Sequence, residues 1–156
     1  MTTTARDVMK TEFQALHPDM PIAEAVDTFL QANVRGNRRV FGLMVTDNDG
    51  HLVGMLSLSD ILLYMRPKHI HIWGMMEDID VDGIIDNACE RIKTVRVGDL
   101  MTTEVVSITP QTHLMMILDI MVKKHIRRLP VLEEDTIVGI VYFSDLFTHI
   151  LKRLSA

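Results

Sequence analysis

Cysteine and long apolar runs are scarce in this chain of 156 residues. The single cysteine, Cys89, can form no disulfide within the chain, which is typical of a reducing compartment. No apolar run approaches the roughly 18 residues that a membrane-spanning helix needs. The first residues also lack the apolar segment of a signal peptide. From these absences we expect a cytoplasmic protein that has no contact with the membrane.

An excess of basic residues is also lacking, because Lys and Arg number 16 against 21 Asp and Glu, for a net charge of -5. This balance argues against binding to nucleic acid. The short motifs of phosphate-binding loops, nucleophile elbows, redox Cys pairs and helical zinc sites are absent. The seven histidines follow no ligand spacing. We therefore expect no catalysis, no metal site and no permanently bound cofactor.

The chain contains an internal repeat, and such duplication decides the interpretation of the fold. The Asp-Val-Met sequence at 7–9 returns as Asp-Leu-Met at 99–101, 92 residues later. The segment at 54–61 returns at 139–146, only 85 residues later, so the first copy carries seven additional residues. Both copies carry apolar residues at the i, i+3, i+4, i+7, i+8 spacing of an amphipathic helix. These positions are 22, 25, 26, 29 and 30 in the first copy and 114, 117, 118, 121 and 122 in the second.

Each copy predicts the order β-α-β-β-α. The expected strands are residues 13–16, 43–46, 52–57, 105–108, 129–132 and 137–142. Closing helices are expected at 58–65 and 143–154, and Thr112 is the expected cap of the second amphipathic helix. One copy spans about 60 residues and leaves apolar faces open, so the two copies should pack together. We therefore predict an α+β fold, with the repeats in pseudo-twofold symmetry around an interrepeat cleft.

The predicted boundaries are residues 5–65 for the first repeat, 66–96 for a linker and 97–154 for the second repeat. Within the linker, residues 82–92 have the apolar spacing of a short helix. Residues 78–83 imitate the start of an EF-hand loop, but Cys89 occupies the twelfth position, where the loop requires Glu. His69 and His71 have no third ligand, which favours a packing role. An apolar patch is expected to cover the module or a dimer mate, and it consists of Trp73, Met75 and Met76.

The repeated order of motifs resembles the CBS domain. The resemblance rests on the Gly-Met-Leu-Ser-Leu-Ser-Asp-Ile sequence at 54–61 and on His-Ile-Arg-Arg-Leu-Pro-Val at 125–131. It covers about residues 5–65 and 96–154. It implies a tandem pair of CBS repeats, a Bateman module, that binds AMP, ADP, ATP or a related adenosyl compound between the repeats. It also implies regulation of a partner protein rather than catalysis.

The residues themselves suit a nucleotide at two places. Asp60 and Asp145 each follow a strand and open a helix, where a carboxylate can accept both ribose hydroxyls. The amides of the first helical turn also favour a phosphate. The alternative is that Ser59 with Asp60, and Ser144 with Asp145, only cap their helices.

The resemblance implies a first site in which apolar side chains of both repeats enclose adenine, Ser57 and Asp60 hold the ribose, and Arg127 reaches phosphate. Its residues are Met55, Ser57, Asp60, Thr103, Val105, Ile126 and Arg127. Lys123 and Lys124, beside Arg127, are interpreted as the solvated end of a helix.

The resemblance also implies a second, mirror-related site. Its residues are Thr11, Phe13, Val34, Arg35, Ile140, Tyr142 and Asp145. Tyr142 replaces the usual Ser or Thr, and Phe13 is bulky, so this site is either blocked or stacks an aromatic ring on the base.

The sequence thus predicts a homodimeric adenine-nucleotide sensor that acts on a partner protein by closing its cleft. The alternative is a structural or dimerisation module that binds no ligand.

Overall fold

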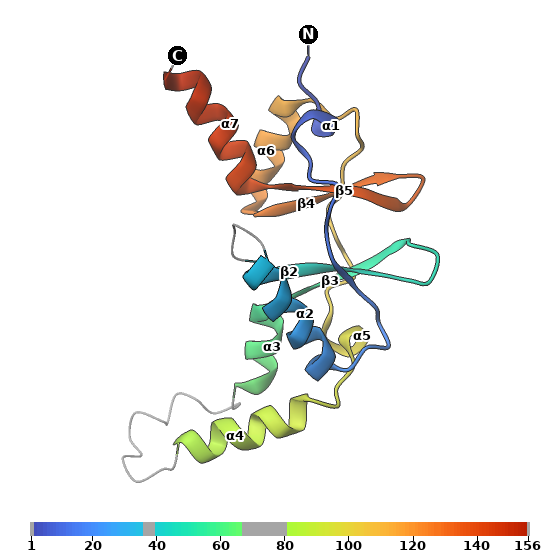
Figure 1. The fold of residues 1–156 in the computed structure, drawn as a ribbon, viewed down its shortest axis with the longest axis vertical. Helices are drawn as coiled ribbons and strands as arrows, with labels where there is room; N and C mark the ends of the chain where they lie inside the picture. The colour runs from blue at the N-terminus through green and yellow to red at the C-terminus, as the bar shows by residue number, and fades with distance from the viewer. Residues whose placement is uncertain (1, 36–39, 67–80, 156) are drawn as a thin grey trace. The chain divides into compact units, whose positions relative to one another are not determined.

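The structure, a computed structural model, describes residues 2–35, 40–66 and 81–155, without the side chains of Val34, Arg35 and Val81. It has the predicted mixed α+β class, with two small sheets and helices around them (Figure 1). The histidine pair, the apolar patch and the first residues of the EF-hand-like stretch lie outside the described residues. The elements are α1 (Ala5–Val8), β1 (Ala15–Leu16), α2 (Ile22–Arg35), β2 (Gly42–Thr46), β3 (Leu52–Ser57), α3 (Leu58–Met65), α4 (Val81–Ile92), α5 (Val97–Leu100), α6 (Leu114–Lys124), β4 (Arg128–Glu133), β5 (Thr136–Tyr142) and α7 (Phe143–Ser155).

The chain forms two compact units that do not coincide with the two sequence copies. The first-repeat unit consists of Gln14–Asp47 and Val53–Thr103. The second-repeat unit consists of Met1–Phe13, Asn48–Leu52 and Glu104–Ala156. The first residues of each copy, which carry the Asp-x-Met motif, therefore pack with elements of the other copy. The boundaries 5–65, 66–96 and 97–154 stay a prediction about the duplication, whereas the two packed units have other boundaries.

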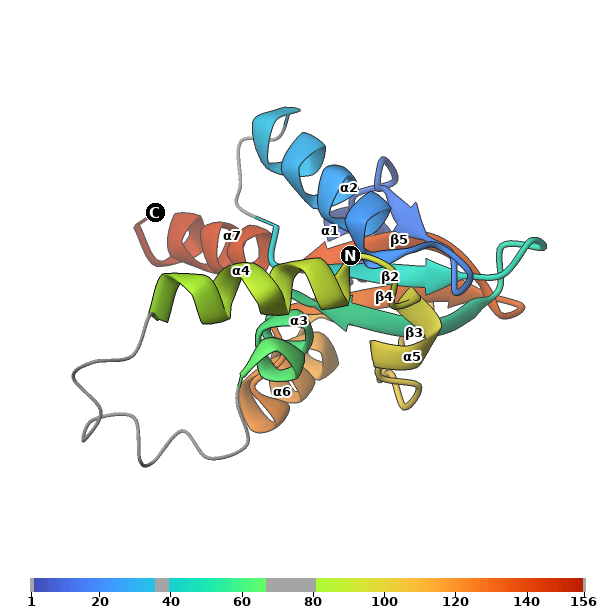
Figure 2. The ribbon, with the colours of Figure 1, turned by 90° about the horizontal axis from the view of Figure 1, so that it is seen from below.

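The first-repeat unit is built on the three-stranded sheet β1-β2-β3. Strand β1 is parallel to β2, with Ala15 opposite Met44 and Leu16 opposite Val45. The predicted apolar stripe of α2 enters the core, where Phe29 is 2% exposed. Helix α4, predicted at 82–92, packs against α3 (Figure 2) and buries Ala88.

The second-repeat unit is built on the antiparallel hairpin β4-β5, which has α6 and α7 on the same side (Figure 1). The turn between the strands contains Glu134 and Asp135, both with positive φ, and the register shifts between Val131 and Leu132. The core contains Ile117 from the predicted stripe of α6, at 0% exposure. Each such side chain stabilises the unit by about 1.5–3 kcal/mol through its burial.

Three sequence predictions are wrong in detail. The strand expected at 13–16 is limited to Ala15 and Leu16. The strand expected at 105–108 is reduced to one parallel bridge between Ile108 and Val131, because Pro130 has no N–H with which to continue the ladder toward residue 105. The cap of α6 is His113, whose Nδ1 accepts the amide of Met116 at 3.3 Å. Thr112 instead accepts the amide of Thr109 at 3.1 Å, in the turn before the helix.

Backbone pairing fixes the N-terminal segment on the second-repeat unit. The amide of Lys10 donates to the carbonyl of Ile140 at 2.8 Å, and the amide of Ile140 donates back to the carbonyl of Lys10 at 2.9 Å. Ala5, at 0% exposure, belongs to the same core as Ile117. A Cβ on Gly139 would lie 2.6 Å from Met9 Sδ, so glycine at this strand position lets the segment approach this closely with Met9 in its present position.

Within the described ranges, no helix combines the length and the hydropathy that crossing a bilayer requires.

Candidate functional site

The start of α3 holds the predicted ribose ligand Asp60 in a fixed position. Ser57 ends β3 and accepts the amide of Asp60 on Oγ at 3.1 Å. In return, the amide of Ser57 donates to Asp60 Oδ2 at 2.9 Å. These two bonds form a capping box, which satisfies two amides that have no partner within the helix. Asp60 thus takes part in capping α3, but its partner is Ser57 and not the predicted Ser59.

The capping box leaves part of the carboxylate available. Asp60 is half-buried, and its Oδ1 accepts no hydrogen bond from any residue that the structure describes. A carboxylate oxygen has room for about two hydrogen bonds, so Oδ2 can accept another besides that from Ser57. Asp60 can therefore cap α3 and accept two hydroxyls at the same time.

Two further predicted residues lie beside this helix start. Met55 exchanges two backbone hydrogen bonds of 2.9 Å with Thr102, which places the neighbouring Thr103 at the edge of β3. A Cβ on Gly54 would lie 2.7 Å from Met101 Sδ and 2.8 Å from the carbonyl oxygen of Thr102. The absence of a Cβ at Gly54 thus permits the close approach of Met101 and Thr102 to β3. Four predicted residues belong to the first-repeat unit: Met55, Ser57, Asp60 and Thr103.

The second-repeat unit contains a groove of about 290 Å³ at the end of α6. His125 ends this helix in the left-handed conformation, with φ 54° and ψ 41°, and so turns the chain toward β4. The next residue, Ile126, donates its amide to the carbonyl of Met121 at 3.1 Å. The lining residues are Met121, Val122, His125, Ile126, Arg127 and Phe143.

Ile126 and Arg127 are thus the two predicted residues that the structure places in this groove. Val105, the third predicted residue of the second-repeat unit, is half-buried and is not part of the lining. The sequence analysis assigned none of the other lining residues, Met121, Val122, His125 and Phe143, to a binding site. The sequence signal that could have found them is the amphipathic pattern of α6. The last turn of such a helix leaves part of its apolar stripe uncovered, and Val122 is an exposed residue of that stripe.

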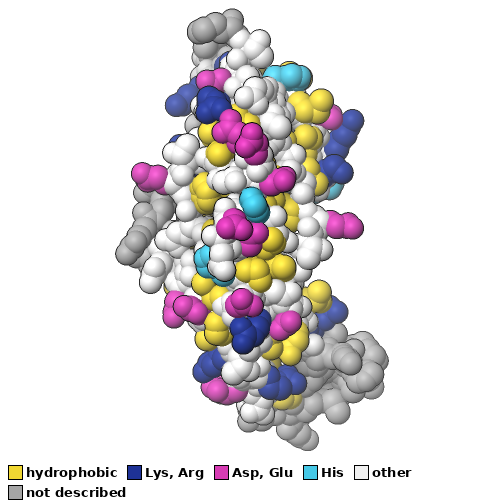
Figure 3. Space-filling model, turned by 90° about the vertical axis from the view of Figure 1, so that its right-hand side faces the viewer, with side chains coloured by type: hydrophobic (Ala, Val, Ile, Leu, Met, Phe, Trp, Pro, Cys, Tyr) yellow, Lys and Arg dark blue, Asp and Glu magenta, His cyan; other side chains and the backbone are white. Residues whose placement is uncertain are grey.

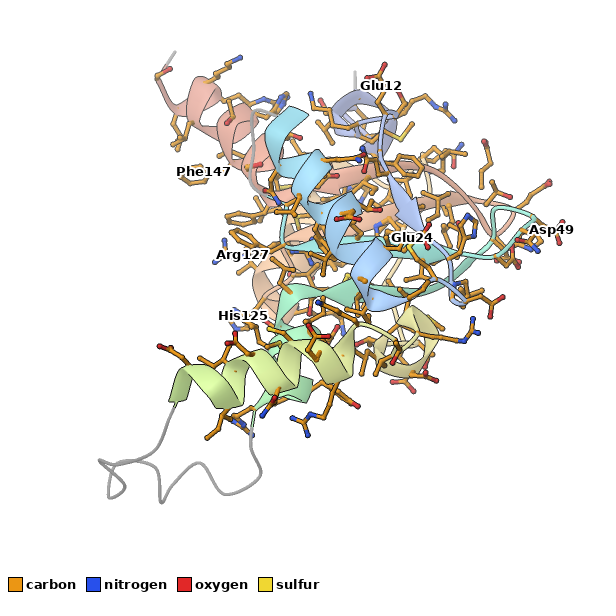
Figure 4. All side chains as sticks on the ribbon, turned by 60° about the horizontal axis from the view of Figure 1, so that its bottom comes forward. Glu12, Glu24, Asp49, His125, Arg127 and Phe147 are labelled. Atoms are coloured by element: carbon orange, nitrogen blue, oxygen red, sulfur yellow. The ribbon has the colours of Figure 1, made fainter. Side chains whose placement is uncertain are left out.

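The groove has a positively charged edge. Figure 4 shows His125 and Arg127 at the same edge of the ribbon, with Phe147 of α7 above them. His125 and Arg127 are exposed. Burial lowers the pKa of the half-buried Arg128, the adjacent Tyr142 raises it, and the charge of Arg127 lowers it again. An anion beside these groups would therefore relieve repulsion between like charges.

Most of the residues predicted for the second site lie in the second-repeat unit. The pairing of Lys10 with Ile140 places Thr11 next to β5, but Ile140 is 3% exposed and offers a ligand little surface. Tyr142 precedes α7 at the position that Ser57 has before α3, so a bulky phenol stands where the first copy has a small hydroxyl residue. Phe13 and Asp145 are half-buried, while the side chains of Val34 and Arg35 lie outside the description.

The two helix starts thus differ. At the start of α3 the carboxylate of Asp60 is bonded to a small hydroxyl residue, Ser57. At the start of α7 the residue three positions before Asp145 is the aromatic Tyr142. The model of the CBS domain matches the chain at residues 5–67 and again at 97–152. The chain belongs to the CBS domain family.

Relatives support this assignment over nearly the whole length. The CBS domain-containing protein YhcV of Bacillus subtilis is 28% identical over 154 residues, which cover 99% of this chain and 90% of YhcV. The uncharacterized protein MJ1225 of Methanocaldococcus jannaschii is 26% identical over 140 residues; the match takes in 90% of this chain and only 40% of that longer protein.

Solved structures share the fold. The CBS-pair protein CBSX2 of Arabidopsis thaliana superposes with a TM-score of 0.76 at 21% identity, covering 100% of this chain and 99% of CBSX2. A crystal structure of CBSX2 in complex with AMP gives a TM-score of 0.71 at 21% identity, with 97% and 98% of the two chains covered. The chain is thus a CBS pair.

Proposed function

We propose that this CBS pair is a regulatory module that binds one adenine nucleotide, AMP, ADP or ATP, and passes the state of its ligand to another protein. The observation that carries the proposal is the geometry of Asp60, which is fixed by Ser57 and still has acceptor capacity. That CBSX2 forms a complex with AMP supports an adenosyl ligand for this fold. In this proposal the module catalyses no reaction, and it works in the cytoplasm.

The ribose is assigned to Asp60. Its carboxylate accepts one ribose hydroxyl on each oxygen, and hydrogen bonds to a charged acceptor are worth about 1.5–3 kcal/mol. The hydroxyl of Ser57 accepts the amide of Asp60 and keeps its own hydrogen for a ribose or phosphate oxygen.

The base and the phosphates are assigned to side chains that both units contribute. Met55 from the first-repeat unit, with Val105 and Ile126 from the second-repeat unit, provides the apolar surface for adenine, and Thr103 lies at its edge. Arg127 provides planar donors for phosphate oxygens. A ligand that binds one arrangement of the chain better than another shifts the population toward it, which is how the signal arises.

One occupied site is proposed rather than two. In the second set of residues, Tyr142 stands where Ser57 stands in the first, and Ile140 is buried. The second helix start therefore lacks both the small hydroxyl residue and an accessible apolar surface.

Titration calorimetry with AMP, ADP, ATP and 2′-deoxy-AMP tests the proposal. We expect AMP to bind at least about tenfold more tightly than 2′-deoxy-AMP, because the lost hydroxyl removes a hydrogen bond to a carboxylate. Asp60→Asn should weaken AMP and abolish this preference, while retaining an acceptor for the amide of Ser57. Asp145→Asn is the matched control and should leave both affinities unchanged. Flat traces for all of these nucleotides with the folded chain would refute the proposal.

A structural role as a dimerisation module is favoured by one further observation. Helix α7 exposes an apolar stripe with i, i+4, i+7 spacing, in which Phe147 is 53%, Leu151 45% and Leu154 76% exposed. A second copy of the chain is proposed to cover it. Light scattering should give a dimer mass for the natural chain and a monomer mass for Leu151→Glu. A monomer mass for both at micromolar concentration would refute the dimer.

A further inference from the structure

A methionine lies against a glycine at the same place in both copies. Met9 and Met101 end the Asp-x-Met motif, and each is the C-cap of a one-turn helix, α1 or α5, with nearly the same backbone angles. The Sδ of Met9 lies 2.6 Å from where a Cβ on Gly139 would be, and that of Met101 lies 2.7 Å from where a Cβ on Gly54 would be. In each unit the thioether therefore occupies space that a strand side chain would need.

Each contact adjoins the backbone pairing that holds its segment on a strand. In the second-repeat unit, Lys10 follows Met9 and exchanges hydrogen bonds of 2.8 and 2.9 Å with Ile140. In the first-repeat unit, the residue after Met101 exchanges two bonds of 2.9 Å with Met55. Both thioethers also pack against the apolar core of their unit. The packing of the methionine and the pairing of the next residue thus support each other.

The two methionines are half-buried, so that solvent reaches part of each side chain. Apolar side chains reach the surface in many places, as the yellow patches between the charged groups in Figure 3 show. Among the 12 methionines of the chain, Met115 is 66% exposed, whereas Met44 and Met121 are 0% and 1% exposed. The chain thus offers thioethers with three degrees of access to a small oxidant.

We propose that Met9 and Met101 are sites of reversible oxidation by hydrogen peroxide, and that their sulfoxides release the two segments from their strands. The thioether sulfur attacks one peroxide oxygen, the O–O bond breaks and an S–O bond forms. The hydrogen on the transferred oxygen passes to the leaving oxygen. The products are one sulfoxide and one water, and the sulfur has lost two electrons to the peroxide. Methionine sulfoxide reductases return the sulfoxide to the thioether.

A sulfoxide disturbs this contact in either of its two positions. If the side chain stays in place, a polar oxygen without a donor lies at the edge of an apolar core, which is unfavourable. If the side chain turns outward, the glycine and the adjoining core lose the atoms that cover them. In both cases the segment is held less firmly, so its strand pairing opens more often.

Peptide mass spectrometry after treatment with increasing hydrogen peroxide tests the modification. We expect the most exposed of these methionines, Met115, to gain an oxygen first and the buried Met44 and Met121 last. Met9 and Met101 should react between them. The modification would be refuted if Met9 and Met101 stayed reduced until the buried methionines had been oxidised.

Hydrogen exchange, at a dose that leaves the buried methionines reduced, tests the release. The amides of Ile140 and Thr102 should exchange at least about tenfold faster after oxidation, because each donates in one of the two pairings. Met9→Leu and Met101→Leu are the matched variants, since leucine fills a similar volume and carries no sulfur. Each variant should keep its protection only in its own unit, at Ile140 and at Thr102 respectively. Unchanged exchange in a chain oxidised at both methionines, or equal losses in the two variants, would overturn the release.

The reversibility has its own test. Methionine sulfoxide reductases A and B together should restore the protection of both amides, because each enzyme reduces one epimer of the sulfoxide. Protection that stays lost after mass spectrometry shows the two methionines reduced again would contradict a reversible switch.

The release in the first-repeat unit has a consequence that rests on the proposed function. The segment after Met101 carries Thr103, and its pairing partner is Met55, so two proposed nucleotide contacts lose their support. Calorimetry should show AMP binding at least about fivefold weaker in the oxidised natural chain, and unchanged in oxidised Met101→Leu.

The same titrations separate the two proposals. Both chains keep Met55, so equal weakening in the two would assign the effect to Met55 and refute the link through Met101. If AMP does not bind the reduced chain, the proposed function fails, while the exchange experiment still decides whether oxidation releases the segments.

Discussion

Replacement of Gly54 by alanine should destabilise the protein more than the same change at Gly139. At Gly54 the new Cβ would meet a flexible side chain, Met101 Sδ at 2.7 Å, and also a backbone atom, the carbonyl oxygen of Thr102 at 2.8 Å. At Gly139 the contacts shorter than 3 Å are only with Met9, and the backbone oxygen of Lys10 lies at 3.1 Å. A methionine can move aside, whereas the backbone at Thr102 cannot move without straining its two bonds to Met55.

The expected magnitudes follow from these contacts. Overpacking costs about 1–3 kcal/mol, and weakening the two bonds between Met55 and Thr102 adds about 0.5–1.5 kcal/mol each. We expect Gly54→Ala to lower the free energy of unfolding by about 2–6 kcal/mol and Gly139→Ala by about 1 kcal/mol. In a chain of this size each kcal/mol corresponds to about 2–4 °C in Tm.

Urea unfolding of single and double variants is the assay. Removing Met9 should relieve most of the cost of Gly139→Ala, because no backbone atom remains closer than 3.1 Å. Removing Met101 should relieve little of the cost of Gly54→Ala, because the carbonyl of Thr102 stays. A double-mutant cycle measures both couplings. Equal costs at the two glycines, or full rescue of Gly54→Ala by Met101→Ala, would refute the reasoning.

Three other changes probe the capping box, the core and the exchanged segment. Ser57→Ala should lower the free energy of unfolding by about 1 kcal/mol through loss of the cap on α3, whereas an equal stability in urea would show that the cap contributes nothing. Ile117→Ala, at a position with 0% exposure, should cost about 2–5 kcal/mol, measured in the same way, and a smaller loss would mean that the core closes over the cavity. Deletion of residues 2–10 should expose the amide of Ile140 to solvent, so its hydrogen exchange should accelerate; unchanged protection would contradict the pairing with Lys10.

The local elements could be predicted from the sequence because their signals are local. The apolar stripe of α2, with Phe29 in the core, follows from helical spacing alone. The packing of the first residues of each copy with the other copy could not be predicted. It depends on contacts between residues far apart in the sequence, such as Met9 and Gly139. A glycine inside an apolar strand does indicate a close backbone approach, but not which segment approaches.

The candidate site was predictable to the same extent. Asp60 was identified from its place between a strand and a helix, and the structure confirms that it starts α3. The groove around Ile126 depends on the left-handed conformation of His125, and nothing in the residue type requires it, since glycine is the usual residue there. The cap of α6 was also not predictable from residue type. The hydroxyl of Thr112 accepts a bond within the preceding turn, and the imidazole of His113 caps the helix instead.

The most direct test of the central claim is an NMR titration of the chain with AMP, with assigned amides and methyl groups. We expect the amide of Asp60 to shift as AMP is added, and the adenine protons to show contacts with the methyl groups of Val105 and Ile126 in the same complex. A nucleotide that shifts Asp60 while its base contacts other side chains, or one that shifts neither set at millimolar concentration, would contradict it.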